Sequence, residues 1–241
     1  MYLDRIEVEN VRNISRAHLD LGRNLNVIEG PNGAGKTAIL EALHLLVRAR
    51  SFRPNTQALV RYDQDQLVVR ATMSDEAGKR TRIGFQKVKN GNSEIRMDGS
   101  VVKQLSTVAA MLPLQVFLPN LSDLVFGTPS VRRKWLDWGV FHVKRDYLDI
   151  HRAYMKVLRQ RNAALKQKTS DPLHAWTNSL VEYAEILNGY RAIYLDRVSE
   201  AIVPCLGSLA PGLNVRLTLD PGWQNESFAS ELERQERRDI Q

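Results

Sequence analysis

Residues Gly30 to Thr37 read Gly-Pro-Asn-Gly-Ala-Gly-Lys-Thr, two glycines separated by four residues and followed by Lys and Thr. The apolar stretch Asn24 to Glu29 precedes this loop, and apolar residues at helical spacing follow from Lys36. This order predicts a β-strand, a glycine-rich turn and a helix, an arrangement in which successive backbone N–H groups converge on one anion. The loop therefore predicts a phosphate-binding site for a nucleoside triphosphate.

Each part of the loop has an expected role in holding phosphates. The backbone amides and the dipole of the helix that follows attract the anion. Lys36 offers a point charge to the β and γ phosphates and is the predicted catalytic residue, while the Thr37 hydroxyl is placed to hold Mg²⁺. The predicted nucleotide-binding residues of the loop are Gly30, Pro31, Asn32, Gly33, Ala34, Gly35, Lys36 and Thr37.

Composition predicts a folded cytoplasmic protein without a membrane partner. The chain has 241 residues, of which 43% are hydrophobic and 25% are charged, enough for a sizeable core and more than one structural unit. Its single cysteine, Cys205, suits a reducing compartment. Charged residues at the N-terminus argue against an export signal. The longest uncharged stretch, residues 104–122, contains prolines and several polar residues and is not expected to span a membrane.

The positive charge is concentrated in one segment. The chain carries a net charge of +7, and between Arg132 and Lys168 eleven Lys or Arg residues stand against three acids, which makes that segment +8 and the rest −1. Three of these basic residues share one helical face, with a fourth about two turns further on: Arg152, Lys156, Arg159 and Lys166. This face predicts phosphate contacts with DNA, and a solvated helix surface is the alternative.

The remaining pattern divides the chain into two regions. Strand patterns cover residues 3–9, 17–21, 67–74, 80–86, 93–97 and 114–118, and a weaker one covers 211–220. Helical patterns cover residues 101–110, 228–241 and the stretch from Pro129 to about Val203, with a break at 170–172. We predict a boundary within residues 119–127, an ATP-binding lobe over residues 1–119 and a basic helical lobe over residues 120–241.

Several motifs together resemble the RecF family of bacterial DNA replication and repair proteins. Besides the phosphate loop, they are Asn10-Val11-Arg12-Asn13, residues 49–53 (Ala-Arg-Ser-Phe-Arg), residues 132–139 (Arg-Arg-Lys-Trp-Leu-Asp-Trp-Gly) and residues 160–165 (Gln-Arg-Asn-Ala-Ala-Leu). That family belongs with SMC proteins and other ABC-type ATPases. The resemblance implies an α/β fold, a P-loop ABC/SMC-type ATPase head in which a mixed-sheet lobe is followed by a helical lobe.

The resemblance also implies a function and further site residues. It implies ATP-dependent binding to DNA gaps and single-/double-strand junctions, ATP-dependent homodimers, and loading of recombinase with partner proteins in the response to DNA damage, including the SOS response. Gln115 lies where a glutamine of this family touches Mg²⁺ and reports on the γ-phosphate, so the resemblance implies that it is a Mg²⁺ ligand and, with Lys36, a catalytic residue. Arg12 and Asn13 resemble the turn that flanks the nucleotide, and Arg50 and Arg53 are further candidates for the γ-phosphate.

Two motifs of ABC-type ATPases are missing from this sequence. No Leu-Ser-x-Gly-Gln signature occurs, because Leu105-Ser106 continues as Thr107-Val108, and no apolar run ends in Asp followed by a catalytic acid, because residues 215–220 are mixed and Pro221 follows. We therefore expect the N-terminal two-thirds of a longer protein, with negligible hydrolysis by this chain alone. A small-molecule P-loop kinase and a transporter-type ABC subunit remain the alternatives.

Overall fold

The computed structural model of the chain describes residues 1–53, 58–118, 122–167, 173–223 and 227–239. The chain divides after Leu118 into two compact units, a first unit of sheet and helices and a second unit of helices, and each is described by itself. Among the described residues, no helix is long and apolar enough to cross a bilayer. The break expected at 170–172 and part of the boundary expected at 119–127 lie outside the described residues.

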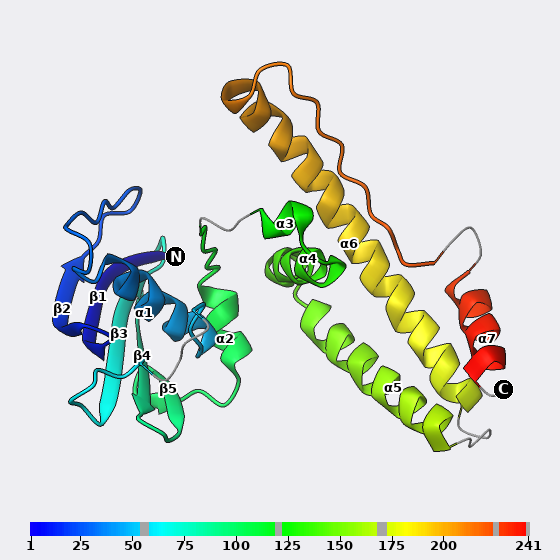
Figure 1. Cartoon of the computed structure of the whole chain (residues 1–241), viewed down its shortest axis with the longest axis horizontal. Coiled ribbons are helices and arrows are strands. Elements are labelled where there is room, and N and C mark those ends of the chain that lie inside the picture. Colours follow the sequence, from blue (N-terminus) through cyan, green and yellow to red (C-terminus); the bar gives the residue numbers. More distant parts are fainter. Residues whose placement is uncertain (54–57, 119–121, 168–172, 224–226, 240–241) are drawn as a thin grey trace. The chain divides into compact units, whose positions relative to one another are not determined.

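The first unit is built on a six-stranded sheet whose neighbours all pair antiparallel, in the order β2-β1-β3-β4-β5-β6 (Figure 1). The strands are β1 (Tyr2–Val11), β2 (Ile14–Asp20), β3 (Gln66–Ser74), β4 (Arg80–Val88), β5 (Ser93–Met97) and β6 (Ser100–Val101). Five of the eight strands expected from the sequence correspond to these strands. The alternation of apolar and polar residues along them gives the sheet one buried and one polar face.

Two helices belong to the same unit. Helix α1 (Lys36–Arg48) packs against β1, β3 and β4 and against α2 (Leu105–Met111). On the buried face of the sheet, Ile6, Val8 and Phe85 are fully buried, and Leu45 of α1 is fully buried as well. Since α1 begins directly after Gly35, this packing fixes the phosphate loop relative to the sheet.

Three expected strands are wrong. Residues 24–29, 114–118 and 211–220 form no strand. A strand needs a neighbouring strand to satisfy its backbone and to cover its side chains, and among the described residues none pairs with these segments. Their apolar side chains are accordingly exposed: 80% for Leu25, 69% for Val27 and 74% for Phe117. The sheet is antiparallel rather than mixed, because the strand expected before the phosphate loop does not join it.

The second unit is helical. Its elements are α3 (Asp123–Phe126), α4 (Pro129–Val143), α5 (Tyr147–Gln167), α6 (Leu173–Leu209) and α7 (Phe228–Asp239). Thr128 and Pro129 occupy the N-cap and first positions of α4, as their order in the sequence predicts. Helices α5 and α6 lie side by side and run in opposite directions (Figure 1). Between them Val157 and Leu180 belong to one buried apolar cluster.

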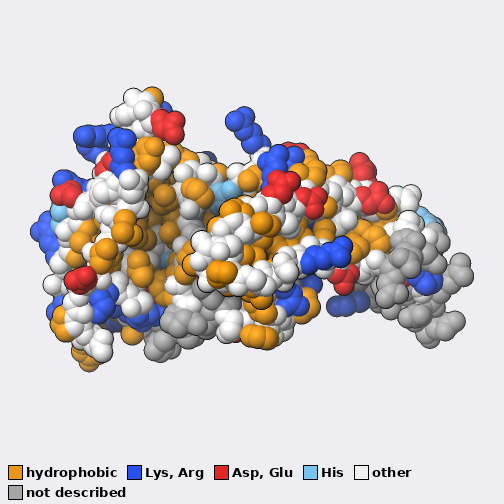
Figure 2. All heavy atoms as spheres, turned by 90° about the horizontal axis from the view of Figure 1, so that it is seen from above, with side chains coloured by type: hydrophobic (Ala, Val, Ile, Leu, Met, Phe, Trp, Pro, Cys, Tyr) orange, Lys and Arg blue, Asp and Glu red, His pale blue; other side chains and the backbone are white. Residues whose placement is uncertain are grey.

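The surface carries basic and apolar side chains side by side. On the face shown in Figure 2, Lys and Arg side chains project between exposed hydrophobic ones. Over the described residues, the exposed apolar side chains include Leu213, which is 55% exposed and lies in a segment without regular structure. Isolated exposed apolar residues are normal on a protein surface, so they define no site by themselves.

Candidate nucleotide and nucleic-acid sites

The phosphate loop has the backbone conformation that its glycines allow. Gly30, Gly33 and Gly35 have φ values of 151°, 84° and 102°, which a residue with a side chain rarely adopts. A Cβ on Gly35 would lie 2.9 Å from Cγ1 of Ile14, so this glycine also allows close contact between the loop and β2. The N–H groups of the first turn of α1 have no carbonyl partner within the helix and can bind an anion.

Lys36 lies across the loop that precedes it. Its Nζ donates hydrogen bonds to the carbonyl oxygens of Gly30, at 2.7 Å, and of Pro31, at 3.0 Å. The ammonium group is therefore held within the turn, where phosphate oxygens could replace the carbonyl oxygens as its acceptors. Thr37 follows in the first turn of α1, and its side chain is exposed.

The turn between β1 and β2 contacts the loop directly. The side-chain amide of Asn13 donates to the carbonyl oxygen of Gly33, so the turn and the phosphate loop are joined, while a contact of Asn13 with a nucleotide stays a prediction. Arg12, with φ 57°, has its guanidinium on Glu41 of α1 instead, through contacts of 2.9 and 2.7 Å. The structure therefore gives Arg12 a link to the helix, and its contact with a nucleotide stays a prediction.

Glu41 is a site residue that sequence reasoning missed. Its side chain is fully buried, and it accepts hydrogen bonds from both Arg12 and the hydroxyl of Ser51. Burial alone would raise the pKa of its carboxyl, but the bonds from Arg12 and Ser51 outweigh burial and hold the pKa below its ordinary value. An acid among the buried positions Ala38, Ala42 and Leu45 was the signal in the sequence.

The segment after α1 is also tied to this helix. Ala49 ends the helix in the left-handed conformation, and the ring of His44 shares a hydrogen bond of 2.6 Å with the carbonyl oxygen of Arg50. Burial lowers the pKa of His44, which favours the neutral ring. Arg50 is exposed and Arg53 is half-buried, and their predicted contact with a γ-phosphate stays untested.

Gln115 does not lie on a strand. It is an exposed residue of the irregular stretch 113–118, which follows α2 in the first unit. Within the part of the chain that the structure describes, no hydrogen bond connects it to the phosphate loop. Its role as a Mg²⁺ ligand and catalytic residue therefore stays a prediction from the resemblance.

The four predicted DNA-binding residues all lie on α5 and are all exposed: Arg152, Lys156, Arg159 and Lys166. The opposite side of the helix carries Val157 and packs on α6. Asp149 is 3.5 Å from Arg152, an exposed contact that neutralises little of the positive charge. Arg161, on the same helix, is buried and donates to Thr177 at 3.0 Å, so it belongs to the packing between helices.

Comparison with known proteins agrees with the fold and with the loop. The sequence profile of the RecF/RecN/SMC N terminal domain matches residues 2–206. DNA replication and repair protein RecF of Shewanella loihica is 35% identical over 243 residues, which cover the whole chain and 67% of the relative, and RecF of Shewanella baltica strain OS223 is 37% identical with the same coverage.

Solved structures give the same result. The recombination mediator protein RecF with ATP, from the RecFOR pathway, superposes with a TM-score of 0.81 at 26% identity, covering 99% of this chain and 68% of that one. An Smc head domain from Pyrococcus furiosus shares the fold, with a TM-score of 0.56 at 15% identity, over 88% of this chain and 66% of that one.

The fold and the phosphate loop thus define the chain as an ATPase head of the SMC/RecF type, with an antiparallel sheet followed by a helical region. Within that class, the chain belongs to the RecF family. The resemblance inferred from the motifs is confirmed, and so is the predicted ATPase-head fold, with an antiparallel sheet in place of the mixed one. The chain spans about two-thirds of the length of the curated relatives that it matches.

Proposed function

We propose that this chain is the nucleotide-binding and DNA-binding part of a recombinational repair ATPase. It binds ATP at the phosphate loop. The side chains of Thr37 and Gln115 hold the Mg²⁺ ion that accompanies the nucleotide. The observation that carries the proposal is the loop itself: three glycines with positive φ, the Lys36 ammonium held within the turn, and the free amides at the start of α1.

DNA binding is assigned to the second unit. The exposed basic face of α5 suits phosphates, and no sequence is read by such contacts because phosphate contacts position a protein without carrying base information. DNA gaps and single-/double-strand junctions, partner proteins that load recombinase, ATP-dependent homodimers and a cytoplasmic location are the finer parts of this proposal. They are supported by family membership, since the relatives are named as replication and repair proteins.

The proposal is tested by removing the lysine of the loop. Lys36→Met in the whole chain should reduce ATP affinity at least tenfold in a calorimetric titration, because a charge-assisted contact contributes about 1.5–3 kcal/mol. Lys79→Met removes an exposed charge from the turn between β3 and β4 and should leave ATP binding unchanged. Equal ATP affinity in the Lys36 variant and the parent would refute the site.

A further inference from the structure

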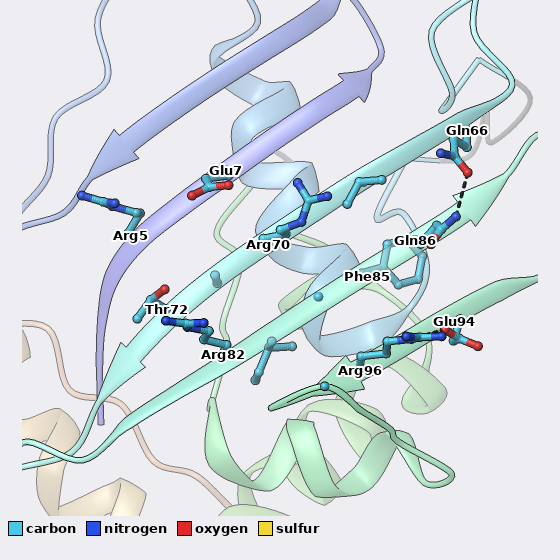
Figure 3. Close-up of a pocket in the computed structure, with 15 residues that line it drawn as sticks. Arg5, Glu7, Gln66, Arg70, Thr72, Arg82, Phe85, Gln86, Glu94 and Arg96 are labelled. Atoms are coloured by element: carbon cyan, nitrogen blue, oxygen red, sulfur yellow. Dashed lines mark hydrogen bonds and ion pairs between the residues drawn. The ribbon is translucent and has the colours of Figure 1, made fainter.

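The polar face of the sheet contains a hollow that neither the phosphate loop nor α5 uses. Its volume is about 690 Å³, and it extends over β1, β3, β4 and β5 on the side of the sheet opposite α1 (Figure 3). The charged residues that line it are Arg5, Arg70, Arg82 and Arg96, together with Glu7 and Glu94. These lining residues have an excess of two positive charges, and two carboxylates outside the lining, Asp20 and Glu9, pair with Arg5 at 2.7 Å and with Arg70 at 3.1 Å.

Three of these arginines surround a glycine. Gly84 of β4 is in register with Arg70 on β3 and with Arg96 on β5, and Arg82 lies two residues before it on the same face. Neighbouring strands are about 4.8 Å apart, so the backbones of Arg70 and Arg96 are separated by roughly 10 Å. Gly84 has no side chain to fill the sheet face between these residues, and Figure 3 shows Arg70, Arg82 and Arg96 on three neighbouring strands of that face.

Nothing in the fold requires a glycine at this position. The φ of Gly84 is not positive, and a Cβ built there would meet only the carbonyl oxygen of Val69, at 4.0 Å. A β-branched residue would favour the strand, because glycine in a strand interior weakens it. The space that a side chain at this position would fill is therefore open to a ligand.

The arginines retain donors for a ligand. Arg70 is paired with Glu9 through its Nη1 at 3.1 Å and Arg96 with Glu94 through its Nε at 2.6 Å, and each guanidinium carries five N–H donors. Among the described residues, none forms a hydrogen bond or an ion pair with the Arg82 guanidinium. The two glutamates hold their arginines beside the hollow, and Arg82 contributes a charge without a carboxylate partner.

We propose that this sheet face, the Gly84 hollow, binds the phosphodiester backbone of DNA. An open hollow with arginines spread across three strands suits a polyanion, whose successive phosphates can each meet a guanidinium. The Gly84 hollow rests on the proposed DNA-binding function and adds a contact surface in the first unit, distinct from α5 in the second.

The test uses the whole chain and the fluorescence anisotropy of a short labelled duplex at several salt concentrations. Gly84→Val fills the hollow without changing the charge, and it should weaken binding about fivefold, while Gly84→Ala, whose Cβ fits, should bind nearly as the parent does. Arg82→Gln should weaken binding about threefold and lower the log–log salt slope by about 0.9. Lys79→Gln, an exposed lysine at the end of the same hairpin, should change little.

Thermal unfolding separates binding from folding. Gly84→Val should unfold at the same temperature as the parent or above it, because valine favours a strand. Parent-like duplex binding by Gly84→Val, or an equal loss in Lys79→Gln and Arg82→Gln, would overturn the Gly84 hollow. If Gly84→Val lost only the binding of inorganic pyrophosphate and kept duplex binding, the ligand would be a free phosphate and the DNA assignment would fall.

The same titration separates this inference from the proposed function. If charge reversal on α5 removes duplex binding while Gly84→Val changes nothing, the Gly84 hollow fails and DNA binding by the chain stands. If the parent chain binds no duplex at low salt, DNA binding by this chain and the hollow fail together, while ATP binding is decided separately by Lys36→Met.

Discussion

Gly35 joins the phosphate loop to α1 and illustrates how one residue type can be required for two reasons. Its φ of 102° strains any side chain, and a Cβ would also meet Ile14 at 2.9 Å. Gly78, in the turn between β3 and β4, has a φ of 80° with nothing within 4 Å of a Cβ. A side chain at Gly78 would cause backbone strain alone, whereas one at Gly35 would cause both backbone strain and a steric clash.

We expect Gly35→Ala to lower the free energy of unfolding by about 2–4 kcal/mol, since left-handed strain and overpacking add. Gly78→Ala should cost about 1–2 kcal/mol, from strain alone. Urea unfolding measures both, and ATP titration should show a loss only for Gly35→Ala. Equal costs in the two variants would mean that the contact with Ile14 is relieved by movement of its side chain.

Glu41 connects α1 to the turn that carries Arg12 and Asn13. Because the carboxylate is fully buried and the Arg12 side chain is 12% exposed, Glu41→Gln leaves a nearly buried guanidinium without its counter-charge. The expected loss is about 3 kcal/mol in urea unfolding. Glu94→Gln breaks an ion pair whose side chains are 44% and 59% exposed and should cost less than about 1 kcal/mol.

The pH dependence of stability should carry the signature of Glu41. Its pKa is lowered in the folded state, so its contribution is complete above the ordinary pKa of about 4.5 and is lost as the pH falls through the lower folded value. Unfolding midpoints measured from pH 7 down to about pH 3 should therefore fall less steeply in Glu41→Gln than in the parent. If the unfolding midpoints of the variant and of the parent fell equally steeply as the pH is lowered, the Arg12–Glu41 pair would not stabilise the fold.

Helix α5 is the element on which the basic charge can be tested. Reversing Lys156 and Arg159 to Glu should lower the log–log salt slope of duplex binding by roughly two units, because each phosphate contact contributes about 0.9. The matched control reverses Lys79 and Lys103, which are exposed residues of the first unit, and has the same change in net charge. An unaltered salt slope in the α5 variant would mean that these basic residues form a solvated helix surface and do not contact DNA phosphates.

The elements that the sequence predicted correctly are those whose pattern is local. Strands β3, β4 and β5 alternate apolar and polar residues, and α4 begins at a Thr-Pro pair, so each was predicted from its own residues. Residues 24–29 look equally strand-like, but a strand needs a neighbour, and no described segment pairs with them. A pattern within a segment does not contain that information.

The candidate site residues that the sequence located are likewise those whose signal is local. The loop and Lys36 follow from a motif, and the exposed face of α5 follows from helical spacing. The Arg12–Glu41 pair and the Gly84 hollow were not predicted, because each joins residues far apart in the sequence whose separate patterns are ordinary. Their chemistry depends on strand order and on helix packing.

At the scale of the whole chain, the two proposed activities lie in different units. The phosphate loop belongs to the first unit and α5 to the second, and each unit has its own buried core. The α5 charge reversals should therefore leave the ATP affinity of this chain unchanged, since they change only residues of the second unit. A change in ATP affinity would show that the units are coupled within this chain.

Binding and hydrolysis should also be separable in this chain. Hydrolysis of ATP needs an acid that orients water and supports Mg²⁺, in addition to a loop that holds phosphates. In this sequence the run from Val215 to Asp220 is followed by Pro221, and the segment forms no strand that could place an acid beside the loop. We expect ATP binding with turnover no faster than the background without protein, with and without duplex DNA.

A phosphate-release assay at saturating ATP measures this, with Lys36→Met as the control for contaminating ATPases. A version extended by the segment that completes the length of its relatives should recover a slow turnover that DNA stimulates. Turnover by the present chain that exceeds background and disappears in Lys36→Met would mean that an acid within these 241 residues already serves catalysis. Glu41 would then be the first residue to replace, because it is a buried acid on α1, the helix that follows the phosphate loop, and it is paired with Arg12.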